Sequence, residues 1–114
     1  MVENKNSVVY LYGFSLRKEA HLGSLITILN EQISTGTKLK IVLMHDGVIG
    51  ISKKGTLPSY LRELFNLPIE IYALIPDIKA RGIDIEAINE NIHLIDYDEL
   101  VDLLAETSKI ISWL

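Results

Sequence analysis

Short apolar runs, most of them separated by helix-like segments, constrain the fold of this chain more than any other feature of its sequence. Residues 8–12 are β-branched or aromatic and are followed by Gly13, so they predict a buried strand. Residues 39–44, 69–74 and 92–95 have a similar character. Residues 39–44 show too little polar alternation for a half-solvated antiparallel strand. They predict burial on both faces, which is typical of parallel sheets.

The segments between these runs carry helical signals. We expect a first helix with Ser15 as its N-cap, and Gly36 marks its end. Its apolar face consists of Leu22, Leu25, Ile26, Leu29 and Ile33. Pro58 predicts the start of a second helix, in which Tyr60, Leu61, Leu64 and Phe65 share a face. Asp96 and Glu99 have capping-box spacing, and the apolar side of this last helix is Leu100, Val101, Leu103 and Leu104.

Residues 76–91 predict a polar loop with room for a helical turn, and residues 110–114 predict a short strand or a packed tail. Strands that alternate with helices favour a mainly parallel sheet, because parallel neighbours need crossover connections. The sequence therefore predicts one α/β domain over residues 7–114, with four to five strands flanked by helices. Residues 1–6 form an expected polar leader.

The composition sets limits on the kind of protein. The chain has 114 residues, of which 48% are hydrophobic and 23% charged, so it is expected to fold unaided around one core. Its apolar runs are far shorter than the roughly twenty residues of a membrane-spanning helix. The N-terminus lacks the basic and apolar segments of a secretory signal. We therefore expect a cytoplasmic protein without a membrane partner.

Charge is divided unevenly along the chain. Residues 1–62 contain eight Lys and Arg against four acids, whereas residues 63–114 contain three against eleven. Nucleic-acid binding normally requires a basic face that displaces counterions from phosphates. The acidic second half does not supply one, so no direct nucleic-acid partner is expected.

The chain has no cysteine, which excludes disulfides, thiolate metal sites and thiol nucleophiles. The polar candidates are Asp46, Asp77 and Arg81, because they follow predicted strands and ligands bind at the carboxyl ends of parallel strands. Asp46 is a candidate base, metal ligand or phosphoryl acceptor. The acceptor role is disfavoured, since residues 13–15 supply no further carboxylate. The favoured interpretation is an Asp46-Gly47 turn whose carboxylate bonds local backbone amides.

Two other polar features leave alternatives open. Arg81 is suited either to a local pair with Asp77 or to a bidentate contact across an interface. Lys53 and Lys54 lie in a glycine-containing loop and are candidates for anion binding, although the lysine of a phosphate-binding loop is missing before Thr56. The three histidines lack metal-ligand spacing, and no serine lies in a nucleophile-elbow motif. We expect no metal and no cofactor.

Several short motifs, taken in order, resemble the DsrH/TusB family, and the resemblance spans nearly everything after residue 6. They are Ser7-Val8-Val9, Leu22, Asp46-Gly47-Val48, Tyr72-Ala73-Leu74, Asp77 with Ala80-Arg81-Gly82, Ile95-Asp96-Tyr97, Val101 and Trp113-Leu114. No single tripeptide among them is diagnostic. The resemblance implies a Rossmann-like fold shared with DsrE- and DsrF-type proteins.

The resemblance also implies a heterohexamer with DsrE/TusD-like and DsrF/TusC-like subunits. Such complexes relay persulfide sulfur, either toward 2-thiouridine in tRNA or in sulfur oxidation, and the essential cysteine lies on the DsrE/TusD-type subunit. Some DsrH-type members have a cysteine that aligns at or beside Leu25. The chain is therefore expected to be a non-catalytic subunit of a sulfurtransferase complex. Candidate interface or strand-end residues are Asp46, Gly47, Asp77, Arg81, Gly82 and Trp113.

Two alternatives remain open from the sequence. The first is a stand-alone homo-oligomer that binds a small anion through Lys53, Lys54 and Arg81. The second is a cysteine-independent enzyme that uses Asp46 or Asp77.

Overall fold

The computed structural model describes residues 7–52 and 58–114, and within them the chain forms one five-stranded parallel sheet. The strand order is β4-β3-β2-β1-β5. The strands are β1 (Ser7–Tyr12), β2 (Lys38–Leu43), β3 (Glu70–Leu74), β4 (Ile92–Ile95) and β5 (Lys109–Trp113). The predicted α/β class with a parallel sheet is confirmed, and residues 110–113 are strand rather than tail. The expected leader and the loop residues Lys53 and Lys54 lie outside the described residues.

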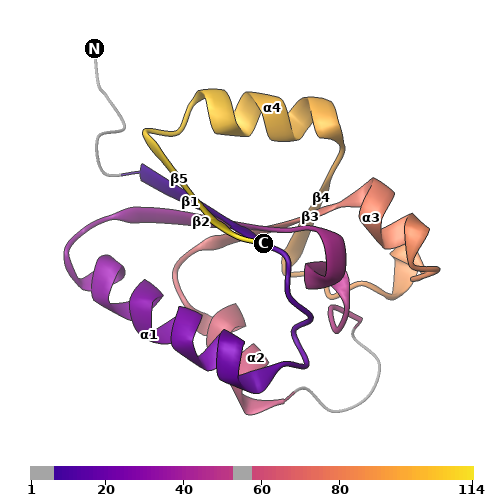
Figure 1. Cartoon of the computed structure of the whole chain (residues 1–114), viewed down its shortest axis with the longest axis horizontal. Helices are drawn as coiled ribbons and strands as arrows, with labels where there is room; N and C mark the ends of the chain where they lie inside the picture. The colour runs from indigo at the N-terminus through magenta and orange to yellow at the C-terminus, as the bar shows by residue number, and fades with distance from the viewer. Residues whose placement is uncertain (1–6, 53–57) are drawn as a thin grey trace.

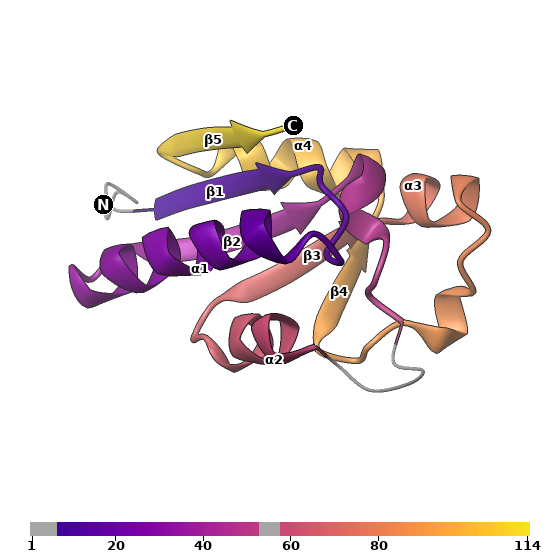
Figure 2. The same cartoon turned by 60° about the horizontal axis from the view of Figure 1, so that its bottom comes forward.

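The helices form a layer on each face of the sheet. They are α1 (Glu19–Ser34), α2 (Ser59–Asn66), α3 (Ile75–Ala80) and α4 (Tyr97–Ala105), with short 3-10 helices η1 (His45–Val48) and η2 (Ile85–Ala87). Figure 1 shows α1 and α2 on one face and α4 on the other. We call these the α1 face and the α4 face. Figure 2 shows α3 beyond the carboxyl ends of the strands, beside β3 and β4.

The core is larger on the α1 face. A row of partners across four strands, Tyr10, Ile41, Ile71 and Ile92, is buried there under the helices. Leu25 of α1 packs in the same cluster and is fully buried. On the α4 face the buried cluster is smaller, and it consists of Val9, Val42, Leu74, Ile95 and Leu100. The sheet is therefore more deeply covered on one side than on the other.

The expectation that residues 39–44 are buried on both faces is only partly confirmed. Leu39, Ile41, Val42 and Leu43 are buried, but Lys40 points to the α4 face with its side chain 38% exposed. It pairs there with Glu70 of β3 at 3.5 Å. A cross-strand ion pair of this kind lets a parallel sheet meet water without an unpaired charge on the face.

Two helix starts differ from the predictions. Helix α1 begins at Glu19, and its N-cap residue is Lys18, whose side chain makes no capping hydrogen bond. The sequence had predicted Ser15 as the N-cap. The Ser15 hydroxyl instead accepts a hydrogen bond from the Arg17 backbone N–H at 3.2 Å. The segment expected to be a loop from residue 76 begins as α3 directly after β3, with Pro76 in its first turn. Proline suits that position because the first helical N–H groups have no intrahelical acceptor.

The last helix agrees with its prediction in all but one side chain. Asp96 accepts a hydrogen bond from the Glu99 N–H at 2.8 Å, and Glu99 accepts one from the Asp96 N–H at 3.2 Å. Leu100 is buried, whereas Val101 is 63% exposed and does not belong to the apolar side. Among residues 7–52 and 58–114, no helix has the length and apolar character needed to cross a membrane.

Candidate functional site at the carboxyl end of the sheet

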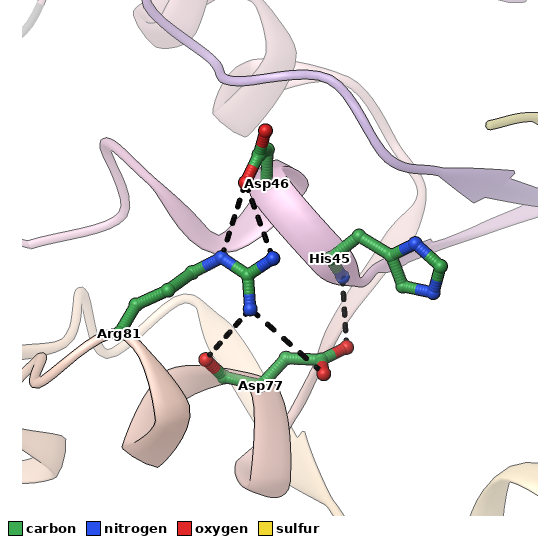
Figure 3. Close-up of polar contacts among 4 residues, drawn as sticks. All are labelled: His45, Asp46, Asp77 and Arg81. Carbon is green, nitrogen blue, oxygen red and sulfur yellow. Dashed lines mark hydrogen bonds and ion pairs between the residues drawn. The ribbon is translucent and has the colours of Figure 1, made fainter.

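Three sequence candidates meet at the carboxyl end of the sheet, where β2 and β3 end side by side. Strand β2 leads into η1, which carries Asp46, and β3 leads into α3, which carries Asp77 and ends next to Arg81. Figure 3 shows the Arg81 guanidinium between the two carboxyl-bearing residues. The parallel pairing of β2 with β3 therefore brings together residues that are 35 positions apart in the sequence.

Arg81 makes its shortest polar contacts with Asp46. Its Nε and Nη2 atoms donate to the same carboxylate oxygen, Oδ1, at 3.2 and 3.1 Å. Its Nη1 atom donates to the Asp77 backbone carbonyl at 3.4 Å and lies 4.0 Å from the Asp77 carboxylate. The Asp46 carboxylate was predicted to bond local backbone amides. In the structure it instead forms an ion pair with Arg81, which follows α3. The local Asp77–Arg81 pair exists but is the longer contact.

Asp77 has a second function in the same group. Its Oδ2 atom accepts a hydrogen bond from the His45 backbone N–H at 2.8 Å (Figure 3). His45 has a φ of 54°, which places a non-glycine residue in the left-handed region. Such a conformation costs about 1 kcal/mol or more and persists where the surroundings determine it. The Asp77 carboxylate therefore stabilises the sharp turn by which the chain leaves β2.

Gly47 is required at this turn by a close backbone approach. A Cβ atom on residue 47 would lie 2.2 Å from the carbonyl oxygen of Tyr12 at the end of β1. Any side chain there would push η1 away from β1 and displace Asp46. Gly82, at the other end of the group, has a φ of 67° and ends the α3 segment. Both glycines thus shape the backbone that carries the charged residues.

Trp113 lies apart from the Asp46–Asp77–Arg81 group. It is the last residue of β5 and packs against Tyr12 of β1, with ring centroids 6.1 Å apart. Its backbone carbonyl accepts a hydrogen bond from the Gly13 N–H at 2.9 Å. The structure therefore gives Trp113 a packing contact at the end of the sheet, and β1 lies between its strand and β2.

A pocket of about 720 Å³ opens beside the charged group. Leu16, Ile49, Leu61 and Ile83 give it an apolar lining, and Arg17, Glu19 and Arg81 contribute charge. Volumes of this order are usual for ligand pockets. However, Arg81 already faces two carboxylates, so its positive charge is largely compensated before any ligand arrives.

The chemistry available in this region is limited. The chain has no thiol, and in the described part of the chain no group of three histidines or acids lies close enough to hold a metal ion. Both carboxylates are engaged, Asp46 by Arg81 and Asp77 by the His45 N–H. His21 stacks on Phe14 with ring centroids 4.4 Å apart, and His93 packs beside Tyr72. The arrangement is suited to fixing a surface rather than to proton transfer.

Leu25 is the centre of the segment in which the resemblance led us to expect the cysteine of some DsrH-type proteins, at this residue or beside it. It lies in the middle of α1 and is fully buried against the sheet. A side chain at this position points into the apolar core, where an ionised sulfur would be desolvated and out of reach of a partner. In this chain the position contributes only to packing.

Comparisons with known proteins find relatives in the DsrH/TusB family. The family model described as "DsrH like protein" matches residues 17–110. Protein TusB of Pectobacterium parmentieri is 37% identical over 73 residues, which are 64% of this chain and 73% of that protein. Protein TusB of Escherichia coli (strain K12) is 35% identical over 74 residues, or 65% of this chain and 74% of that protein.

Two solved structures share the fold. The ychN protein from E. coli superimposes with a TM-score of 0.75 at 14% identity and covers 95% of this chain and 99% of its own. A protein of unknown function from Methanobacterium thermoautotrophicum gives a TM-score of 0.75 at 16% identity, over 93% and 97% of the two chains. These likenesses concern the fold alone. The match over residues 17–110 shows that this chain belongs to the DsrH-like family.

Proposed function

We propose that this chain is a non-catalytic subunit of a sulfur-relay complex, in which other subunits of the same fold carry the persulfide. The observation that carries the proposal is the combination of DsrH-like family membership with the absence of any cysteine. A persulfide needs a protein sulfur atom to hold the transferred sulfur. This chain supplies none, so in this proposal the sulfur passes over thiols of DsrE/TusD-like and DsrF/TusC-like partners, either toward thiolated tRNA or in sulfur oxidation.

The burial of Leu25 supports a structural contribution. At or beside the position where a cysteine is expected in some DsrH-type proteins, this chain has Leu25, which is fully buried and fills the core beneath α1. At Leu25 the chain therefore contributes packing and no sulfur chemistry. Relay by thiols also suits the reducing cytoplasm, where cysteines stay unpaired.

The Asp46–Asp77–Arg81 group is the proposed contact with a partner. Arg81 and Asp77 have side chains that are 29% and 15% exposed, whereas the Asp46 side chain is 63% exposed. The two less exposed residues hold the turn, and Asp46 presents a carboxylate of fixed direction at the surface. A preorganised charge of this kind contributes more to orientation and specificity than to affinity.

Purification of the tagged chain from its own cells tests the proposal. We expect co-purification of cysteine-bearing proteins of the same fold and a particle larger than a dimer of this chain. Deletion of the chain should abolish either 2-thiouridine in tRNA or sulfur oxidation. Recovery of this chain without such partners, together with unchanged tRNA thiolation and unchanged sulfur oxidation in the deletion strain, would contradict it.

The contribution of the charged group is tested in the same assay with Asp46→Asn. We expect weaker partner recovery, because the substitution removes the surface charge while it keeps the size of the side chain. Asp98→Asn, in the first turn of α4, is the matched control, since it also removes one exposed acid and lies on another element. Equal recovery with both variants would remove Asp46 from the interface.

The anion-binding alternative receives less support from the geometry. Of the three residues proposed to bind the anion, Lys53 and Lys54 lie outside the described residues and Arg81 lies within them. The Arg81 guanidinium is already paired with Asp46 and lies near Asp77. A second anion at this guanidinium would meet two carboxylates. We therefore prefer the relay subunit.

A further inference from the structure

Strand β5 is an open edge of the sheet. Within residues 7–52 and 58–114 it pairs with β1 and lies at the end of the strand order. Figure 2 shows β5 at the margin of the sheet, with β1 on one side and no strand on the other. Ile110 is 46% exposed and Ile111 is half-buried, so β-branched side chains occupy its centre. Edges of this composition are templates for pairing with another strand unless charges or proline block them.

The direction of the backbone groups in β5 follows from one hydrogen bond. The Trp113 carbonyl accepts from the Gly13 N–H, so the backbone groups of residue 113 face β1. Successive residues of a strand direct their N–H and C=O groups to opposite sides. The backbone groups of Lys109 and Ile111 therefore also face β1. The N–H and C=O groups of Ile110 and Ser112 point outward, away from the sheet.

The outward groups fit a second copy of the same strand. An antiparallel pair with a two-fold axis at Ile111 places Ile110 opposite Ser112, and each such pair exchanges two backbone hydrogen bonds. The outward N–H and C=O groups of Ile110 and Ser112 then have hydrogen-bond partners in each copy. All five residues of β5 pair, and Ile111 meets its own symmetry mate across a non-hydrogen-bonded position, where side chains approach most closely.

The side chains are complementary in the same register. Lys109 is the one charged residue of β5, and the two-fold axis places it opposite Trp113 of the other copy. A lysine ammonium over an indole ring is an attractive pair. No like charges of β5 are placed opposite each other. A homodimer with this register therefore has complementary backbone groups and complementary side chains.

We propose that two copies of this chain associate through antiparallel pairing of their β5 strands, which joins their sheets into one continuous sheet. The interface is isologous, because the same strand contributes from both copies. This proposal is independent of the sulfur-relay function, since it concerns the chain in the absence of other subunits.

The other edge of the sheet is less suited to the same contact. Strand β4 has four residues instead of five, and its polar His93 is exposed. The segment just before β4 is joined to another part of the chain, because the Asn89 N–H donates to the Ile51 carbonyl at 2.9 Å and Ser52 forms a β-bridge with Ile88. Pairing is therefore expected at β5.

The test measures the molecular mass of the purified chain, without partners, by sedimentation equilibrium over a range of concentrations. Ser112→Pro is the disrupting variant. Proline removes the outward N–H and is tolerated on an edge strand where that N–H faces solvent, so pairing with β1 is retained. Ser112→Thr is the matched control, because it keeps the N–H and favours strand structure. Ile110→Lys is a second disrupting variant that introduces charge at the edge and keeps every backbone donor.

We expect a dimer for the natural chain and for Ser112→Thr. In the Ser112→Pro dimer two backbone hydrogen bonds are lost, one per copy, which raises the dissociation constant by ~30-fold or more. Ile110→Lys also weakens the dimer, and circular dichroism confirms that each variant is folded. A natural chain that remains monomeric at every soluble concentration would overturn the proposal. So would a dimer whose dissociation constant is the same in the folded disrupting variants as in Ser112→Thr.

Discussion

The two faces of the sheet are built from different interactions. On the α1 face, aromatic and aliphatic side chains from the strands pack under two helices and are almost completely excluded from water. On the α4 face, one helix covers the apolar cluster around Val42 and Leu100, and a polar group of Lys40, Glu70, Tyr72 and His93 occupies the rest. Parallel sheets usually need apolar cover on both faces. Here charge pairing and aromatic contacts replace part of that cover.

The two faces differ in what they contribute to the stability and to the surface chemistry of the domain. Burial of a complete leucine side chain contributes about 2 kcal/mol, whereas an exposed ion pair contributes at most ~1 kcal/mol. The α1 face should therefore dominate the free energy of unfolding. The α4 face should tolerate substitution and respond to pH.

Truncation of one leucine on each face provides the largest expected effect. Leu25→Ala removes a fully buried side chain in the α1-face core and should cost ~3–5 kcal/mol. Leu100→Ala should cost less, ~2–3 kcal/mol, because its side chain is 7% exposed and the smaller cluster is able to relax. Chemical denaturation of both variants measures the difference. Equal losses would break the contrast between the two faces.

A cysteine at the same position tests how well the α1 face is sealed. Leu25→Cys should destabilise the chain by ~2 kcal/mol, since a smaller side chain leaves part of the site empty. Its thiol should react with a thiol reagent only as fast as the protein opens. Ser24→Cys, next to it on the exposed side of α1, is the control and should react at once. Rapid labelling of a folded Leu25→Cys variant would show that this face is accessible to sulfur chemistry.

The smallest expected effect concerns Tyr72 on the α4 face. Burial, assisted by its 2.8 Å hydrogen bond to the Glu70 carboxylate, raises the pKa of Tyr72 from 10.0 to about 12. Above pH 10 the unfolded chain loses the phenolic proton while the folded chain keeps it, so stability falls as the pH rises toward 12.

Tyr72→Phe should cost ~1 kcal/mol at neutral pH, through the lost hydrogen bond to Glu70. The stability gap between the natural chain and this variant should then narrow as the pH rises from 10 toward 12. Tyr10 and Tyr12, whose pKa values are also raised by burial, are present in both proteins and cancel in the comparison. Denaturation midpoints measured across this pH range check the prediction. A constant gap would show that Tyr72 titrates normally in the folded chain.

Features that depend on neighbouring residues were predictable from the sequence. The capping box of Asp96 and Glu99 was predicted because its partners are three residues apart, and both hydrogen bonds are present. The alternation of apolar runs with helix signals likewise predicted the parallel sheet. In contrast, the start of α1 was misplaced at Ser15, because that helix begins without a side-chain cap and is held by burial of its apolar face.

Features that depend on strand order were not predictable in the same way. Asp46, Asp77 and Arg81 were each recognised as strand-end residues, yet the Asp46–Arg81 pair was not foreseen. It requires β2 and β3 to be neighbours and α3 to begin immediately after β3. The polar loop expected in that segment would have left Arg81 without a fixed position. The sequence therefore predicted which residues form the candidate site, whereas the contacts between them depend on the order of the strands.

The position of β5 has a consequence for how the chain folds. Ser7 at the start of β1 and Ser108 just before β5 exchange hydrogen bonds across a separation of 101 residues. During synthesis, β1 to β4 leave the ribosome before β5, so β1 is temporarily the unpaired margin of a growing sheet. Contacts between such distant segments slow folding, because a long loop must close before they form. Docking of β5 should therefore be the final, rate-limiting event of folding, and the nascent chain is most vulnerable to aggregation just before it.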